Sequence, residues 1–268
     1  MESSPPSCYR HPGNRGGVIC QRCDRPICPD CMHQASVGFH CPECARVGKQ
    51  KVVRAGQLSS TPVVTNALIA ANLAIFVVGI GSGLQTKSSV VFDGGLAGPL
   101  VASGEWYRLI TSGFLHANAI HIGFNCFVLY QLGQLMEPVL GRARFALVYL
   151  VAMLSGSLGV LLLDPNAITV GASGAVFGLM GAAVAAMRSR GINPFQTGLG
   201  ATIMLNLVIT FSIPGISIGG HVGGLIGGFV AGWILTDIGP ARTRDRRLPV
   251  AAVVAFGVLV AGAALAVA

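Results

Sequence analysis

Residues 170–187, VGASGAVFGLMGAAVAAM, and residues 218–236, IGGHVGGLIGGFVAGWILT, are apolar stretches that each hold one exceptional polar side chain. Ser173 lies near the start of the first stretch, and His221 lies near the start of the second. Burying an ionisable side chain in a bilayer costs on the order of a few kcal/mol, so an intramembrane histidine usually has a function. The two stretches therefore indicate both the fold and the place of its chemistry.

Gly174 and Gly178 are four residues apart in the first stretch, and glycines repeat every four residues from Gly220 to Gly232 in the second. On a helix this spacing forms a face of small residues, which lets two backbones approach closely in a membrane. We expect the two helices to pack together and to bring Ser173 and His221 to the same depth.

The whole chain has the composition of a membrane protein. Its 268 residues are 52% hydrophobic and only 10% charged, whereas soluble proteins carry roughly 25% charged residues. Several apolar segments approach the ~20 residues that cross a bilayer. They predict an all-α polytopic fold with seven spans, near residues 62–81, 119–136, 145–163, 172–187, 196–212, 218–236 and 249–268.

Basic residues predict the orientation of these spans. With the N-terminus in the cytoplasm, all 18 Lys and Arg except Lys87 and Arg108 fall on the cytoplasmic side, as the positive-inside rule requires. We expect a multi-pass protein of a prokaryotic cell membrane with an extracytoplasmic C-terminus. The net charge of +8 is thus a topology signal.

The chain divides into four predicted regions. They are a Cys/His module (1–45), a basic linker (46–61), a core of six transmembrane helices (62–237) and a seventh helix (248–268). The segment between the first two spans, 82–118, combines aromatic residues with a cation. It fits either an amphipathic segment at the headgroups or an ordinary ordered loop.

Ser173 and His221 together provide a nucleophile and a base, the minimum equipment for acyl transfer. No carboxylate is placed to complete a triad, so we predict a Ser–His dyad, with Phe177 as a candidate stacking partner of His221. His121 and Asn125 lie four residues apart on one helical face and are candidate oxyanion donors. Alternatively, they only form hydrogen bonds between helices.

The chain resembles the rhomboid family of intramembrane serine proteases across roughly residues 60–237. The motifs that carry this resemblance are Trp106-Tyr107-Arg108, His116 with His121 and Asn125, Gly171-Ala172-Ser173-Gly174, and Gly220-His221 followed by spaced glycines. Trp-Tyr-Arg departs from the Trp-Arg that is frequent in the family, and Phe177 replaces a familiar Tyr. Stacking needs only a ring face, so the second change removes no chemistry.

The resemblance implies a serine-type endopeptidase that cleaves in or near the transmembrane helices of membrane proteins, without a cofactor for catalysis. It implies Ser173 as nucleophile and His221 as general base and acid. It also implies an oxyanion hole of His121, Asn125 and the Ser173 N–H, in a water-filled cavity open to the outer face, with lipid around the protein. The seventh helix resembles the six-plus-one arrangement of some members.

Two other functions fit parts of the pattern. One is a catalytically inactive scaffold that binds membrane proteins, although such proteins usually lack the serine or the histidine. The other is a small-solute transporter, for which intramembrane histidine is also natural. No repeat relates two halves of this chain, which argues against a transporter.

The first 45 residues contain four ligand pairs with the spacing of zinc knuckles, sufficient for two tetrahedral Zn sites. The pairs are Cys8 and His11, Cys20 and Cys23, Cys28 and Cys31, and Cys41 and Cys44. Adjacent pairs can share an ion, or alternate pairs can do so in a B-box-like cross-brace. His40 is an alternative to Cys41.

So short a segment lacks a substantial core, so bound zinc would supply its folding energy. Its arginines follow no DNA-reading pattern, and nucleic acid is not expected as a partner. We expect the module to bind a cytosolic protein or to regulate the enzyme; the simplest alternative is a structural cap.

Overall fold

A computed structural model describes residues 6–35, 37–47, 61–81, 89–238 and 247–268 of the chain. The chain divides into two compact units, Met1–Ser59 and Ser60–Ala268. Most of the predicted basic linker, and three of the arginines that predict the orientation (Arg242, Arg244 and Arg246), lie outside the described residues.

The smaller unit consists of two short antiparallel hairpins followed by a helix. Strand β1 (Val18–Ile19) pairs with β2 (Pro26–Ile27), and β3 (His33–Gln34) pairs with β4 (Phe39–His40). A 3-10 turn, η1 (Pro29–Cys31), and helix α1 (Pro42–Val47) complete the unit. Its buried cluster is Ile27 with five cysteines, so cysteine side chains form most of its core.

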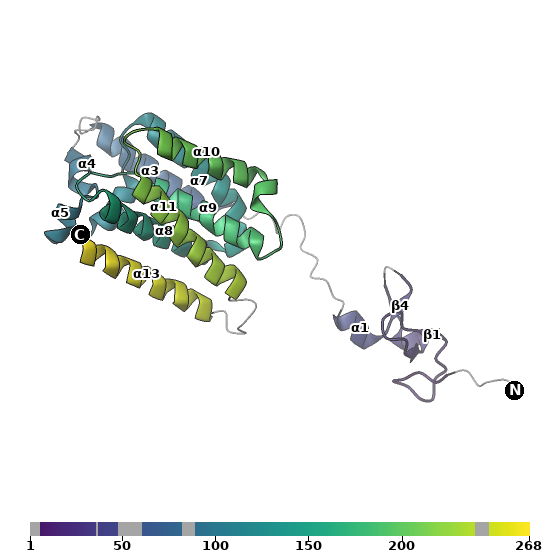
Figure 1. The fold of residues 1–268 in the computed structure, drawn as a ribbon. Coiled ribbons are helices and arrows are strands. Elements are labelled where there is room, and N and C mark those ends of the chain that lie inside the picture. Colours follow the sequence, from purple (N-terminus) through teal and green to yellow (C-terminus); the bar gives the residue numbers. More distant parts are fainter. Residues whose placement is uncertain (1–5, 36, 48–60, 82–88, 239–246) are drawn as a thin grey trace. The chain divides into compact units, whose positions relative to one another are not determined.

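The larger unit is helical (Figure 1). Its long helices are α3 (Val63–Gly81), α7 (Ala119–Leu140), α8 (Arg142–Leu163), α9 (Ser173–Arg188), α10 (Gly198–Ser212), α11 (Ile218–Trp233) and α13 (Arg247–Val267). A π-helical turn, η4 (Ile234–Ile238), follows α11 directly.

Each predicted apolar segment coincides with one of these helices. Among the described residues, the helices Arg142–Leu163, Ile218–Asp237 and Arg247–Val267 are long and apolar enough to cross a membrane, and the chain is a multi-pass membrane protein. The apolar parts of α3, α9 and α10 are shorter. The count of seven crossings stays a prediction.

The boundary between α7 and α8 lies outside the predicted apolar segments. Helix α7 continues past residue 136 to Leu140, and α8 begins at Arg142 instead of residue 145. Gly141, with φ of 80°, turns the chain between them. Charged residues in these last and first turns hide the helix ends from a hydropathy pattern.

A buried carboxylate ties α7 to the beginning of α3. Glu137 accepts hydrogen bonds from the backbone N–H groups of Val64 (2.9 Å) and Thr65 (2.8 Å) and from the Thr65 hydroxyl (2.7 Å). Its side chain therefore satisfies backbone donors that the first turn of a helix leaves unpaired.

Short helices fill most of the described part of the segment between the first two spans. They are α4 (Ser89–Gly94), α5 (Gly98–Ala102), α6 (Arg108–Thr111) and the 3-10 turn η2 (Ser112–Phe114). Buried Arg108 forms an ion pair with Glu105 and donates to the carbonyls of Phe92 and Gly95, both at 2.7 Å. Neighbouring Trp106 is 60% exposed. The segment is thus an ordered structure organised around one cation.

Glycine contacts hold α11 against α8 and α9. A Cβ atom added to Gly228 would overlap the backbone of Gly178, and one added to Gly224 would overlap the backbone of Gly174. On the α8 side, a Cβ at Gly219 would overlap the backbone of Gly159. The close approach that the small-residue faces predict is confirmed; we call this three-helix contact the glycine seam.

Candidate active site

Ser173 is the first residue of α9 and lies two residues after Gly171, whose backbone has a positive φ. Gly171 has φ of 135°, a conformation that side chains rarely allow. Its N–H donates to the Ser112 carbonyl (2.9 Å), and two residues earlier Thr169 forms a two-bond bridge with Leu96. The segment before α9 is therefore fixed to the short helices between the first two spans, which sets the start of α9 and the position of Ser173.

His221 lies in the first turn of α11. The Ser217 hydroxyl oxygen caps this helix by accepting from the N–H of Gly220 (3.0 Å). The His221 side chain is buried, and its ring stacks on that of Phe177, with centroids 4.2 Å apart and planes at 17°. The predicted stacking partner is confirmed.

The two other candidate residues come from the first two turns of α7. Asn118 caps the helix by accepting from the N–H of His121 (2.9 Å), and buried Asn125 donates from Nδ2 to the His121 carbonyl (2.9 Å). The ring of His116 meets that of His121 edge-on, with centroids 5.0 Å apart. His121 and Asn125 thus belong to one local network.

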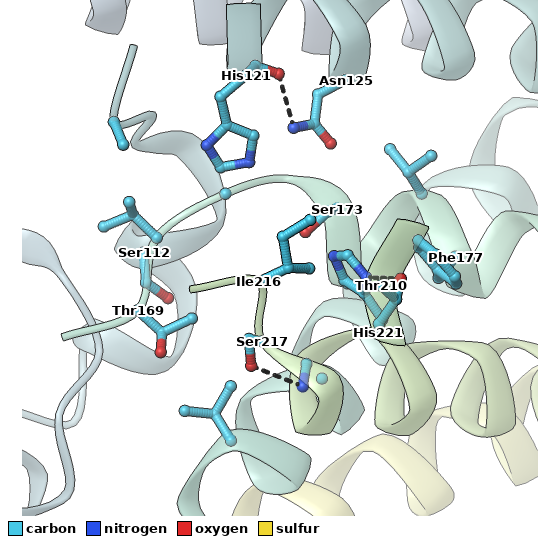
Figure 2. A pocket seen from close by; sticks show the side chains of 18 of the residues that line it. Ser112, His121, Asn125, Thr169, Ser173, Phe177, Thr210, Ile216, Ser217 and His221 are labelled. Atoms are coloured by element: carbon cyan, nitrogen blue, oxygen red, sulfur yellow. Dashed lines mark hydrogen bonds between the residues drawn. The ribbon is translucent and has the colours of Figure 1, made fainter. Parts of the chain in front are cut away.

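One cavity of about 860 Å³ joins all four predicted residues (Figure 2). Besides these four, its polar lining includes Ser112, Asn118, Ser157, Asp164, Thr169, Asn206, Thr210 and Ser217. Ser173 lies between the α7 pair on one side and His221 with Phe177 on the other. The cavity therefore gathers a hydroxyl, two imidazoles and an amide from three helices.

The space beside Gly171 is within reach of both halves of this group. A Cβ atom at Gly171 would lie 2.8 Å from Nε2 of His121 and 3.5 Å from Oγ of Ser173. A small group placed there would therefore be close to both the Ser173 hydroxyl and the His121 ring. A site near 3 Å from both nucleophile and donor is what acyl transfer requires.

Thr210 is a partner of His221 that our sequence reasoning missed. Its Oγ1 lies 2.7 Å from Nδ1 of His221 and 2.7 Å from the carbonyl oxygen of Asn206. Thr202, Asn206 and Thr210 recur every four residues in an apolar stretch. That spacing places them on one helical face and could have identified them.

A family model for the rhomboid domain matches residues 103–238, just over half of the chain. The chain belongs to the rhomboid family. The match contains all four candidate active-site residues, and the Cys/His module lies outside it.

The rhomboid domain has relatives in bacteria and in eukaryotes. The chain is 34% identical to "Rhomboid protease GluP" of Bacillus subtilis over 153 residues, an alignment that covers 56% of this chain and 30% of that protein. It is 32% identical to "Rhomboid-like protease 1" of Toxoplasma gondii (46% of this chain, 45% of that one) and 33% identical to "Rhomboid-related protein 3" of Homo sapiens (42% and 27%). The chain thus spans less than half the length of these relatives.

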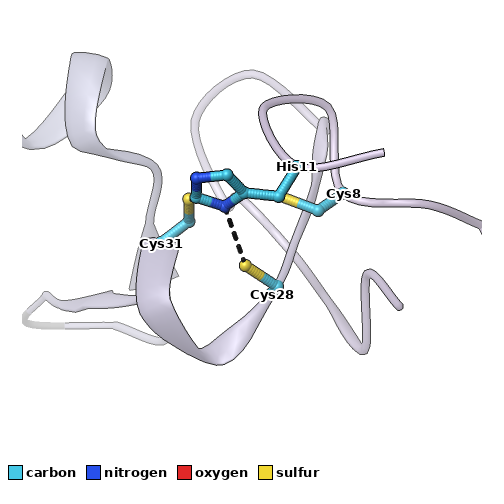
Figure 3. A group of neighbouring side chains, drawn as sticks. All are labelled: Cys8, His11, Cys28 and Cys31. Atoms are coloured by element: carbon cyan, nitrogen blue, oxygen red, sulfur yellow. Dashed lines mark hydrogen bonds between the residues drawn. The ribbon is translucent and has the colours of Figure 1, made fainter. Parts of the chain in front are cut away.

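Outside the rhomboid domain, the eight predicted metal ligands gather in two groups. Cys8, His11, Cys28 and Cys31 form one group (Figure 3), and Cys20, Cys23, Cys41 and Cys44 form the other. Within each group all ligand atoms lie within 4.8 Å of one another. Alternate pairs meet, as in a cross-brace, and Cys41 rather than His40 belongs to the second group.

The dimensions and electrostatics of both groups suit zinc. A tetrahedral Zn–thiolate site has S···S edges of about 3.8 Å, and the Sγ atoms of Cys23 and Cys41 are 3.8 Å apart. Burial raises the pKa of Cys8, but hydrogen bonds led by the Arg10 backbone outweigh it and lower the pKa to about 6. Burial and neighbouring thiolates raise the pKa of Cys31 to about 11. A bound cation would favour the ionised form of these thiols.

Proposed function

We propose that this protein is an intramembrane serine endopeptidase that hydrolyses peptide bonds in or near the transmembrane helices of membrane proteins. The observation that carries the proposal is that Ser173 and His221 line one cavity, with His121 and Asn125 on the other side of Ser173. Family membership supports the same chemistry, since several relatives are named as proteases.

In this mechanism His221 acts first as base and then as acid. Its Nε2 takes the proton of the Ser173 hydroxyl while Oγ forms a bond to the carbonyl carbon of the scissile peptide. The electron pair of the C=O π bond moves to oxygen. The tetrahedral intermediate then expels the amine, which takes the proton from His221, and water hydrolyses the acyl-enzyme by the same steps.

The oxyanion would be stabilised by His121, Asn125 and the N–H of Ser173. The Asn125 amide carries two hydrogens and uses one for the His121 carbonyl, so one donor stays available. The N–H of Ser173 lies at the N-terminus of α9, where the helix dipole favours negative charge. Each lost oxyanion donor typically costs about 10²–10³ in kcat.

Water is a reactant, so the cavity must admit it although it lies among apolar helices. We propose that the N-terminus is cytoplasmic and that the cavity opens toward the outer side of the membrane, as the positions of the basic residues predict. Membrane-impermeant labelling of single cysteines placed at each terminus, in sealed vesicles, tests this: labelling of both termini from one side would contradict it.

For the Cys/His module we propose two structural zinc ions and a cytosolic protein partner. The two groups of ligand atoms support the ions. Capture of a partner from cytosol by the full-length protein, lost when the hairpins are unfolded by chelation, would support the second part; equal capture after chelation would contradict it.

The deciding experiment is cleavage of a single-span substrate by the purified protein in liposomes. Wild type is compared with Ser173→Ala and His221→Ala, each checked for unchanged thermal unfolding. We expect both variants to lose cleavage. We expect a fluorophosphonate to label Ser173 in wild type and to label neither variant. Absence of cleavage of several substrates, together with absence of labelling, would contradict the protease and favour a helix-binding scaffold.

A further inference from the structure

Thr210 presents its hydroxyl to the Nδ1 nitrogen of His221. The Thr210 side chain is 2% exposed, and its Oγ1 lies 2.7 Å from Nδ1 of His221. It comes from α10, whereas His221 belongs to α11 and its stacking partner Phe177 to α9. The imidazole is therefore held by its face and by one ring nitrogen.

The second contact of Thr210 fixes the direction of the first. Oγ1 also lies 2.7 Å from the Asn206 carbonyl oxygen, and a carbonyl oxygen can only accept a hydrogen bond. The single hydroxyl hydrogen is therefore used toward Asn206. The contact with His221 is then a hydrogen bond only if Nδ1 carries a hydrogen and donates it to Oγ1.

We propose that Thr210 is a positioning residue that holds His221 in its Nδ1–H tautomer and leaves Nε2 free to accept the Ser173 proton. This inference rests on the proposed proteolytic function for its catalytic consequence. In serine proteases with a triad, a carboxylate performs this task. Here a neutral threonine, itself oriented by the backbone of α10, performs it.

The hydrogen bond should strengthen during the reaction. When His221 takes the proton it becomes an imidazolium, and its Nδ1–H bond to Thr210 changes from neutral to charge-assisted. Hydrogen bonds to charged groups contribute about 1.5–3 kcal/mol, which corresponds to a factor of about 10–100 in rate. Since substrate does not need this bond in the ground state, its loss should lower kcat and leave KM unchanged.

The test uses Thr210→Val, which preserves shape and removes the hydroxyl, and Thr210→Ser, which retains it. Thr202→Val is the matched control, because Thr202 lies on the same helix and forms the same kind of bond to a carbonyl four residues earlier, but is only half-buried. We expect a 10- to 100-fold lower kcat for Thr210→Val, with KM within about twofold and unchanged thermal unfolding. The kcat of Thr210→Ser should stay within about threefold of that of wild type, and the kcat of Thr202→Val should equal that of wild type.

A second readout does not depend on proteolysis. In full-length protein with ¹⁵N-labelled histidine, imidazole nitrogen shifts distinguish Nδ1–H from Nε2–H, and His221→Gln identifies the signals. We expect Nδ1–H in wild type and loss of this preference in Thr210→Val. An Nε2–H tautomer in wild type, or a wild-type kcat in Thr210→Val, would overturn the proposal. An inactive wild type with the expected tautomer would instead count against the proposed function alone.

Discussion

Two features of the structure require glycine at position 171. Its φ of 135° disfavours any side chain, and a Cβ would contact the His121 ring and approach the Ser173 hydroxyl. The residue thus shapes the segment before Ser173, the proposed nucleophile, and also leaves empty the space between the His121 ring and the Ser173 hydroxyl.

Gly171→Ala should therefore lose activity for a local reason. We expect labelling of Ser173 by a fluorophosphonate to fall at least about 100-fold, in line with the loss of an oxyanion contact. Gly191→Ala is the matched control, because Gly191 also has positive φ (71°), but among the described residues beyond its chain neighbours none has a heavy atom within 4 Å of its Cβ position. It should carry the backbone strain, about 1–3 kcal/mol, and keep wild-type labelling. Equal labelling of the two variants would contradict this account.

Glu105 makes the segment around Arg108 sensitive to acid. Hydrogen bonds from the Tyr107 hydroxyl and the Arg108 guanidinium hold the pKa of the Glu105 carboxyl below its usual range. An unfolded glutamate takes up its proton near pH 4.3, and the folded one does so at lower pH. The stabilisation is therefore complete above the unfolded pKa and is lost as the pH falls through the folded pKa.

We expect wild type to have a higher Tm than Glu105→Gln at pH 7, and this difference should shrink below about pH 4. Thermal unfolding in detergent between pH 7 and pH 3 measures it. A difference that stays constant over this range would mean that the carboxylate charge contributes nothing to the segment.

At the scale of helices, the glycine seam determines how closely α11 approaches its neighbours. Gly228→Ala places a methyl group against the backbone of Gly178, and overpacking of this kind costs about 1–3 kcal/mol. Gly262→Ala in α13 is the control, because its Cβ position has open space and alanine favours helix by about 1 kcal/mol. Unfolding in mixed micelles should show a loss for the first variant and none for the second.

The positions of the long helices could be predicted because hydropathy reports burial in lipid directly. The Ser173 and His221 helices could be paired because glycine spacing is local in the sequence. The burial of Arg108 could not be foreseen, since it depends on carbonyls of Phe92 and Gly95, more than ten residues away. The contact of Thr210 with His221 likewise depends on how α10 packs, which its own sequence does not reveal.

At the scale of the whole molecule, the chain joins a membrane-embedded unit to a module whose small core consists mostly of cysteines. We expect about two zinc ions per chain by elemental analysis of the full-length protein, and about one or fewer in Cys28→Ser. Cys126→Ser is the control, because Cys126 belongs to α7 and to neither ligand group. Zinc content that is equal in the Cys28 and Cys126 variants would refute the assignment of these ligands.

The glycine seam has a mechanical consequence. Contacts between ordinary side chains can adjust when the side chains change rotamer. Contacts between glycine backbones cannot adjust in this way, because glycine has no side-chain torsion angles. The main-chain geometry of α9 and α11 therefore fixes the positions of Ser173 and His221 relative to each other. If the protein cleaves membrane proteins as proposed, any accommodation of differently shaped substrates must come from parts outside the seam, such as the chain between α10 and α11 or the short helices beside the cavity.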